Sequence, residues 1–188
     1  MKTGLLGGSF NPFHNAHLAL AQSAVKQQFV EQVWFIPTFI HPLKSNDELL
    51  NFQTRLALIN KVIKNIPYLK AFDFEKKMDN ISYTANLMKF LYQQYPQHEF
   101  LFIIGYDILA EIKKWSDYSW LKKNVDYLII NRNSKEKLTI NQIDSYQFLK
   151  IDPIEISSTE IRNLIKNHKS IHNLVPKVIE NDIVNLYS

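Results

Sequence analysis

Short apolar runs alternate with longer amphipathic stretches along most of this chain of 188 residues. The short runs are typical of buried strands, and the stretches between them carry apolar residues at helical spacing. Alternation of this kind predicts an α/β fold with a doubly wound, mostly parallel sheet and helices on both faces. The predicted strands are residues 2–6, 33–37, 68–74, 99–104 and 125–130. The predicted helices begin near His14 and near Ser157, and also cover residues 52–63 and 82–95.

The length suits one domain, residues 1–188, of which residues 157–188 form a helical C-terminal part. Residue Ser157 begins a capping box with Glu160, which marks the start of that part. The chain has no cysteine, so disulfides, thiolate metal sites and thiol nucleophiles are excluded. No repeat or low-complexity linker suggests a second domain.

The charge and hydropathy of the chain limit the kinds of ligand and the cellular location that we expect. The net charge of +4 fits an anionic ligand, and the dispersed Lys and Arg residues favour a small phosphorylated molecule over a nucleic acid. The first residues hold only a two-residue apolar run, Leu5-Leu6, which is too short for a signal peptide. The longest apolar stretch is interrupted by Asp107 and is too short to cross a membrane. We therefore expect a cytoplasmic protein.

Unusual residues follow three of the predicted strands. Gly7 and Gly8 follow the first, His41 and Lys44 lie in the loop after the second, and Gly105-Tyr106-Asp107 follows the fourth. The carboxyl ends of parallel strands meet at one edge of the sheet, which is where ligands bind in such folds. The sequence therefore predicts a ligand site at that edge.

The stretch GGSFNPFHNAH, residues 7–17, combines features of a phosphate site. Paired glycines let a ligand approach the backbone, and Pro12 stiffens the turn before a new helix, whose positive end favours anions. His14 and His17 share one face of the first turn and can donate to phosphate oxygens. Taken alone, the glycines also fit a simple turn, and the histidines a surface pair or a metal pair with no evident third ligand. The pattern is neither a dinucleotide-binding glycine motif nor a P-loop.

Two signatures resemble those of the nucleotidyltransferase superfamily that carries the HxGH motif. GSFNPFHNAH is similar to its first signature, and ISSTEIR, residues 156–162, to its second. Within the superfamily, the chain resembles the bacterial nicotinate-nucleotide adenylyltransferases over its whole length. The supporting segments are HPLK (41–44), SYTANL (82–87), FIIGYD (102–107), Trp115 and INR (130–132).

This resemblance implies a Rossmann-like fold and transfer of AMP from ATP to nicotinate mononucleotide in NAD biosynthesis. Pyrophosphate and nicotinate adenine dinucleotide are the products. Such a transfer needs positioning and charge neutralisation rather than a nucleophilic side chain. Mg²⁺ is expected to arrive with ATP, with no metal site in the protein. Another acceptor, such as nicotinamide mononucleotide or phosphopantetheine, and a non-catalytic nucleotide-binding regulator are the alternatives.

The resemblance also implies roles for individual residues. The expected catalytic residues are His14, His17, Lys44 and Arg162. The expected ATP-binding residues are Gly7, Gly8, Ser9, Phe10, Gly105, Asp107, Ile156, Ser157, Ser158 and Thr159. The expected mononucleotide-binding residues are Ser82, Tyr83, Thr84, Trp115 and Arg132, with Trp115 stacked on the pyridine ring.

Several of these residues also have purely structural interpretations. Lys44 fits a solvated loop, Ser157 and Thr159 fit helix capping, Asp107 fits an N-cap, and Trp115 fits the core.

Two positions depart from the family pattern. Ala16 replaces the glycine of the first motif, and Asn86 stands where relatives often carry Asp.

Overall fold

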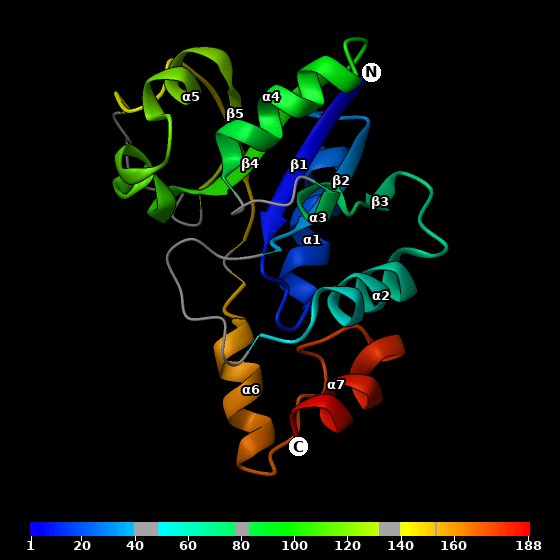
Figure 1. Ribbon diagram of the computed structural model, residues 1–188. Helices are drawn as coiled ribbons and strands as arrows, with labels where there is room; N and C mark the ends of the chain where they lie inside the picture. Colours follow the sequence, from blue (N-terminus) through cyan, green and yellow to red (C-terminus); the bar gives the residue numbers. More distant parts are fainter. Residues whose placement is uncertain (40–48, 78–82, 132–139, 153) are drawn as a thin grey trace.

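The computed structural model describes residues 1–39, 49–77, 83–131, 140–152 and 154–188 (Figure 1). Within these residues, six strands form one sheet in the order β3-β2-β1-β4-β5-β6, and every neighbouring pair is parallel. This order confirms the predicted doubly wound, Rossmann-like sheet. The strands are β1 (Lys2–Gly8), β2 (Gln32–Pro37), β3 (Leu69–Ala71), β4 (Glu99–Gly105), β5 (Asp126–Asn131) and β6 (Ser145–Lys150).

The sequence predictions for the strands are wrong at both edges of the sheet. Strand β6 was not predicted, and β3 is much shorter than the predicted 68–74 because Phe74 already begins a helix. An edge strand has one neighbour and remains largely open to solvent, as the mostly exposed side chains of β6 show. Edge strands therefore lack the continuous apolar run that identifies the buried central strands.

Helices cover both faces of the sheet, as predicted. One face packs against α1 (Asn15–Lys26), α2 (Phe52–Ile63), α6 (Ser158–Lys166) and α7 (Glu180–Tyr187). The other packs against α3 (Phe74–Lys77), α4 (Thr84–Gln94), α5 (Tyr118–Asn124) and the short 3₁₀ helices η1 (Tyr106–Ala110) and η2 (Ile112–Lys114). A third 3₁₀ helix, η3 (Lys177–Ile179), precedes α7.

Side chains alternate between the two faces along each central strand, as the pleat of a strand requires. Leu6 belongs to the cluster with α1, α2, α6 and α7, whereas Leu5 belongs to the cluster on the opposite face. The C-terminal helices α6 and α7 lie beyond the end of the sheet toward which β1 points (Figure 1). None of the helices in the described ranges is long and apolar enough to span a membrane.

The pairing of β1 with β4 ends before either strand does. β1 pairs with β2 up to Gly8, and β4 pairs with β5 up to Gly105, but the β1–β4 register stops at Leu5 and Phe102. This position is the switch point of the fold, where the chain changes direction across the sheet and where ligands bind in doubly wound proteins. The carboxyl ends of β1 and β4 are therefore available to a ligand.

Candidate active site

A tight loop connects β1 to α1 at the switch point. Phe10 is fully buried but adopts a left-handed backbone conformation, with a φ of 47°, and the Asn11–Pro12 peptide bond is cis. A left-handed conformation costs a residue with a side chain about 1–2 kcal/mol. Such strain is retained only where the surrounding contacts hold it, as is typical of functional sites.

His14 and His17 stack at the start of α1. Their ring centroids lie 3.6 Å apart, with the ring planes at 20° to each other. His14 is buried and is the N-cap residue of α1. Its backbone N–H donates to Nδ1 of His17 across 3.2 Å. The aromatic rings of Phe10 and Phe13 flank His17, with centroids 4.8 Å and 5.4 Å from its own.

This environment sets the protonation state of His17. Burial lowers the pKa of His17 well below its ordinary value of 6.5, and the neighbouring His14 lowers it further. The imidazole is therefore neutral at pH 7. Because Nδ1 accepts a hydrogen bond, the single proton is on Nε2. His17 thus offers one fixed N–H donor at the carboxyl end of β1.

The fold itself requires the two glycines of the loop, Gly7 and Gly8, neither for their backbone conformation nor for space. No glycine of the described residues has a positive φ. A methyl group added at Gly7 would meet Phe102 at an ordinary 3.5 Å, and one at Gly8 would meet the Phe10 ring at 3.4 Å. The fold itself therefore tolerates a side chain at Gly7 and leaves that backbone open to a ligand.

Helix α6 brings part of the second signature to this loop. Ser158 Oγ donates to the carbonyl oxygen of Pro12 across 2.9 Å, and Arg162 Nη1 donates to that of Asn11 across 2.8 Å. Ser158 and Arg162 are four residues apart and share one face of the helix.

The neighbouring residues of this signature lie elsewhere on α6. Ser157 caps the helix by accepting from the N–H of Glu160 across 3.1 Å, which confirms its predicted capping role. The exposed Thr159 lines an open hollow along the outer side of the helix, together with Ser157 and Asn163. Ile156 is partly buried and packs against the core. The structure thus brings Ser158 and Arg162, but not Ser157 and Thr159, to the loop.

The end of β4 carries the other group of predicted residues. Asp107 lies within η1, whose N-cap is Gly105, so its predicted alternative role as an N-cap is wrong. Its carboxylate folds back over Gly105 so closely that a side chain there would collide with it. Asp107 itself is exposed and available to a ligand.

Trp115 follows η2 and lies on the same side of the site. It is partly buried and sets its ring edge-on to Phe102, with centroids 6.2 Å apart. Tyr83 is the N-cap residue of α4 and Thr84 its first residue, and both are partly exposed. Trp115 is therefore anchored on one side and accessible on the other.

Comparison with known proteins assigns the chain to a family. The cytidylyltransferase-like family model matches residues 5–164. The chain belongs to the cytidylyltransferase-like family. A curated relative from Flavobacterium psychrophilum is 37% identical over 179 residues, which cover 94% of this chain and 92% of the relative. That relative is named a probable nicotinate-nucleotide adenylyltransferase.

Solved structures support the fold of this cytidylyltransferase-like chain. Nicotinic acid mononucleotide adenylyltransferase from Plasmodium falciparum, complexed with NaAD, superposes with a TM-score of 0.82. The two sequences are 22% identical, and the match covers 99% of this chain and 95% of the other. A second structure of that protein, complexed with APC, gives a TM-score of 0.81 at 20% identity, covering 99% and 96% of the two chains.

The two departures from the family pattern lie in different surroundings. Ala16, in α1, is buried and lines a small cavity whose other walls include Ile130 and Ile151. Its methyl group is thus accommodated at the end of β5. Asn86 is exposed on the first turn of α4. Four residues singled out in the sequence, His41, Lys44, Ser82 and Arg132, lie outside the described residues.

Two residues that sequence reasoning did not select also contact the loop. Arg55, in α2, is buried and donates from Nη1 to the carbonyl oxygen of Ser9 across 2.7 Å. Tyr187, in α7, donates to Oδ1 of Asn11 across 2.6 Å. An arginine on the apolar face of a predicted helix was the signal for Arg55, since a buried arginine is rare without a structural partner. No signal in the sequence distinguishes Tyr187.

Proposed function

We propose that this protein transfers AMP from ATP to nicotinate mononucleotide. An oxygen of the 5′-phosphate of the mononucleotide forms a bond to the α-phosphorus of ATP. The bond from that phosphorus to the oxygen bridging the α- and β-phosphates breaks, and pyrophosphate leaves. The second product is nicotinate adenine dinucleotide. The names of the curated relative and of the structural neighbours support this reaction.

The stacked pair of His14 and His17 is the observation that carries the proposal. His17 is neutral and has its proton on Nε2, so it can donate to a phosphate oxygen without a change of protonation. A donor fixed before reaction stabilises the negative charge that develops on the transferred phosphate. His14, Ser158 and Arg162 surround the same loop, and Gly7, Gly8, Ser9 and Phe10 would offer backbone contacts to ATP.

The remaining assignments follow the family resemblance. We propose that Lys44 and Arg162 neutralise phosphate charge, and that Asp107 accepts from a ribose hydroxyl. Trp115 would stack on the pyridine ring, near Ser82, Tyr83, Thr84 and Arg132. Gly105, Ile156, Ser157 and Thr159 complete the proposed ATP contacts.

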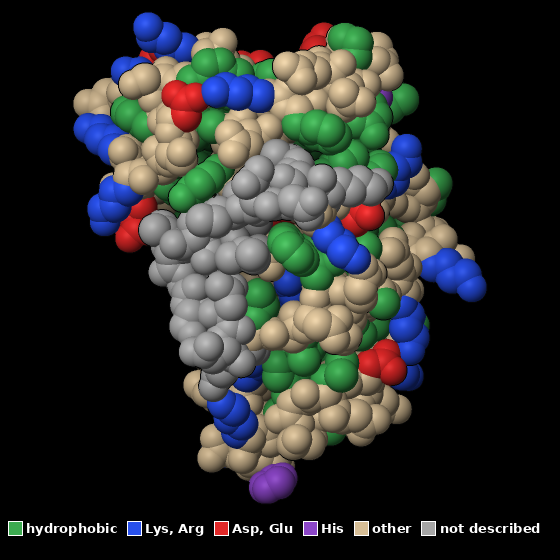
Figure 2. Space-filling model, in the orientation of Figure 1, with side chains coloured by type: hydrophobic (Ala, Val, Ile, Leu, Met, Phe, Trp, Pro, Cys, Tyr) green, Lys and Arg blue, Asp and Glu red, His purple; other side chains and the backbone are tan. Residues whose placement is uncertain are grey.

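Mg²⁺ is treated as part of the ATP substrate in this proposal. It balances the triphosphate charge and that of the leaving pyrophosphate. No three His, Asp or Glu side chains come together as a metal site within the described ranges. On the face shown in Figure 2, the Lys and Arg side chains are scattered rather than gathered in one stripe. A cytoplasmic location and a single domain of residues 1–188 belong to the same proposal.

Pyrophosphate release with a panel of acceptors tests the proposal. Purified protein is assayed with ATP, Mg²⁺ and either nicotinate mononucleotide, nicotinamide mononucleotide or phosphopantetheine. We expect turnover with nicotinate mononucleotide at least about tenfold more efficient than with the amide. We propose that backbone N–H groups bind the nicotinate carboxylate. The NH₂ group of the amide would leave such donors unpaired, which costs about 1–3 kcal/mol for each. Preference for another acceptor would reassign the substrate, and no turnover with any would indicate a regulator.

A further inference from the structure

We propose that Arg55 and Tyr187 are positioning residues, which hold residues 9–12 so that the backbone of the loop faces the phosphates of ATP. This inference deepens the proposed function and rests on it. It concerns two helices, α2 and α7, that contribute none of the catalytic or binding residues assigned above.

Arg55 fixes one peptide group of the loop directly. Its Nη1 donates to the carbonyl oxygen of Ser9, and its Nε donates to the carbonyl oxygen of Leu50 across 2.8 Å. The ring of Phe52 lies 5.6 Å from the guanidinium carbon and covers it. Because two donors of one rigid, planar group are fixed at once, the direction of the Ser9 carbonyl is set.

The direction of the Ser9 carbonyl also determines where the backbone N–H of Phe10 points. The N–H and C=O groups of a trans peptide point in opposite directions. The carbonyl of Ser9 points to Arg55, so the N–H of Phe10 in the same peptide group points away from it. Phe10 is the residue in the left-handed conformation, and without an anchor this conformation would relax. Arg55 therefore determines where one backbone donor of the loop is directed.

Tyr187 fixes the next residue of the loop. Oδ1 of Asn11 accepts from Tyr187 Oη and from the backbone N–H of Leu50, across 2.6 Å and 3.0 Å. Burial raises the pKa of Tyr187, so its hydroxyl stays protonated and remains a donor at neutral pH. The penultimate residue of the chain is thus bound to the loop at the opposite end of the sequence.

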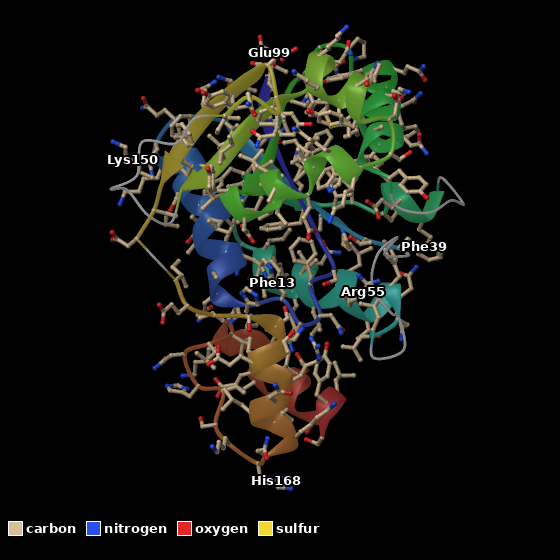
Figure 3. All side chains as sticks on the ribbon, turned by 90° about the vertical axis from the view of Figure 1, so that its left-hand side faces the viewer. Phe13, Phe39, Arg55, Glu99, Lys150 and His168 are labelled. Carbon is tan, nitrogen blue, oxygen red and sulfur yellow. The ribbon has the colours of Figure 1, made fainter. Side chains whose placement is uncertain are left out.

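The elements meet in one place although they are distant in sequence. In Figure 3, Arg55 on α2 and Phe13 lie at the level where the sheet meets the C-terminal helices, far from Glu99 at the other end of the sheet. An ion pair between α2 and α7 provides a matched control. Lys61 and Asp182 form an exposed ion pair, 2.7 Å apart, between the same two helices, and neither contacts the loop.

The test compares Tyr187→Phe and Arg55→Lys with Asp182→Asn. ATP affinity is measured by calorimetry with Mg²⁺, and the His17 imidazole is titrated by ¹⁵N NMR. These readouts need no turnover, so they remain valid if the proposed reaction fails. We expect at least about a tenfold loss of ATP affinity in both loop variants, by analogy with small misplacements at active sites. We also expect the pKa of His17 to rise toward its ordinary value in these variants. In Asp182→Asn, both the ATP affinity and the pKa of His17 should stay at their wild-type values.

Two results would overturn the inference. The first concerns Tyr187→Phe, which keeps the ring and removes only the hydroxyl. The inference fails if this variant binds ATP within about twofold of the wild-type affinity and leaves the pKa of His17 unchanged. The other is an equal loss in Asp182→Asn, which would show that any loosening of α7 has the same effect. If Arg55→Lys fails to fold, Tyr187→Phe decides the question, because it removes one hydroxyl and keeps the ring in place, whereas Arg55→Lys alters a fully buried side chain. If the protein is active, kcat of the two loop variants is also measured well below their melting temperatures. A fall in kcat there reflects loss of positioning, because the variants are still folded.

Discussion

The side of the site proposed for the phosphates (here the phosphate side) is held by hydrogen bonds from distant helices. The side at the end of β4 rests instead on short turns and apolar packing. Carbonyl oxygens of Ser9, Asn11 and Pro12 accept from side chains of α2 and α6. Trp115, on the other side, is anchored by its backbone bond to Ile112 and by the edge of Phe102.

This difference matches the chemistry proposed for each side. Negative charge builds up at the phosphates, and donors stabilise it best when they are already fixed before the reaction. The pyridine ring needs mainly a flat apolar surface, which a partly exposed aromatic residue supplies without a rigid hydrogen-bond network. Loss of a donor to the phosphates should therefore reduce kcat, whereas loss of the aromatic surface on the other side should raise KM for the mononucleotide.

Loss of the His17 imidazole should have the largest effect. His17→Ala removes the fixed Nε2–H donor, and kcat should fall by about 10² or more, as for other donors to a transition state. His168→Ala, at an exposed histidine just after α6, is the matched control and should leave kcat unchanged. Near-normal turnover of a folded His17→Ala variant would remove His17 from the mechanism.

The contact of Asp107 with Gly105 allows a test of the end of β4. Asp107→Asn removes the charged acceptor proposed for a ribose hydroxyl and should raise KM for ATP about tenfold, since such bonds contribute about 1.5–3 kcal/mol. Gly105→Ala should have a similar effect, because its methyl group displaces the same carboxylate.

Because both changes act on one carboxylate, the double variant should lose little more than either single variant. Fully additive losses would show that Gly105 acts independently of Asp107, and an unchanged KM in Asp107→Asn would exclude the proposed contact.

A smaller, selective effect is expected at Trp115. Trp115→Ala should raise KM for the mononucleotide several-fold and leave that for ATP nearly unchanged, since aromatic stacking contributes roughly 0.5–1.5 kcal/mol beyond area burial. Trp115→Phe keeps an aromatic surface and should recover much of the loss. Equal changes for both substrates, together with a lower melting temperature, would instead show that Trp115 belongs to the core.

The pH dependence of stability should show the smallest effect. His17 has a folded-state pKa below its ordinary value of 6.5, so below pH 6.5 the unfolded chain binds more protons than the folded chain. The free energy of unfolding should therefore fall as the pH drops from 7.5 through 6.5 toward the folded-state pKa.

Urea denaturation between pH 5 and 8 measures this slope, and His17→Gln should flatten it. The pKa of His98 is also lowered, first by burial and then by the N-terminal amino group, so His98→Gln is the parallel variant at the other end of the sheet. If His17→Gln leaves the slope unchanged, His17 is not the buried neutral group that the phosphate side requires.

The sequence alone identified the central strands, the helices α1, α2, α4 and α6, and the two signatures that meet at the switch point. It succeeded there because β1, β2, β4 and β5 are buried on both sides and so appear as continuous apolar runs. The histidine pair was equally visible, because residues three apart at the start of a helix must share one face. The periodicity and spacing of nearby residues thus indicate which segments form buried strands and which side chains share a helix face.

Only the tertiary structure revealed what holds the loop. Arg55 lies 46 residues from Ser9 along the chain, and Tyr187 lies 176 residues from Asn11, so no local pattern links them. The same holds for the tautomer of His17, which depends on one backbone N–H, and for Ser158 facing the loop while Thr159 faces away. Local sequence sets which groups are present, whereas long-range packing decides which way each buried polar group must point to find its partner.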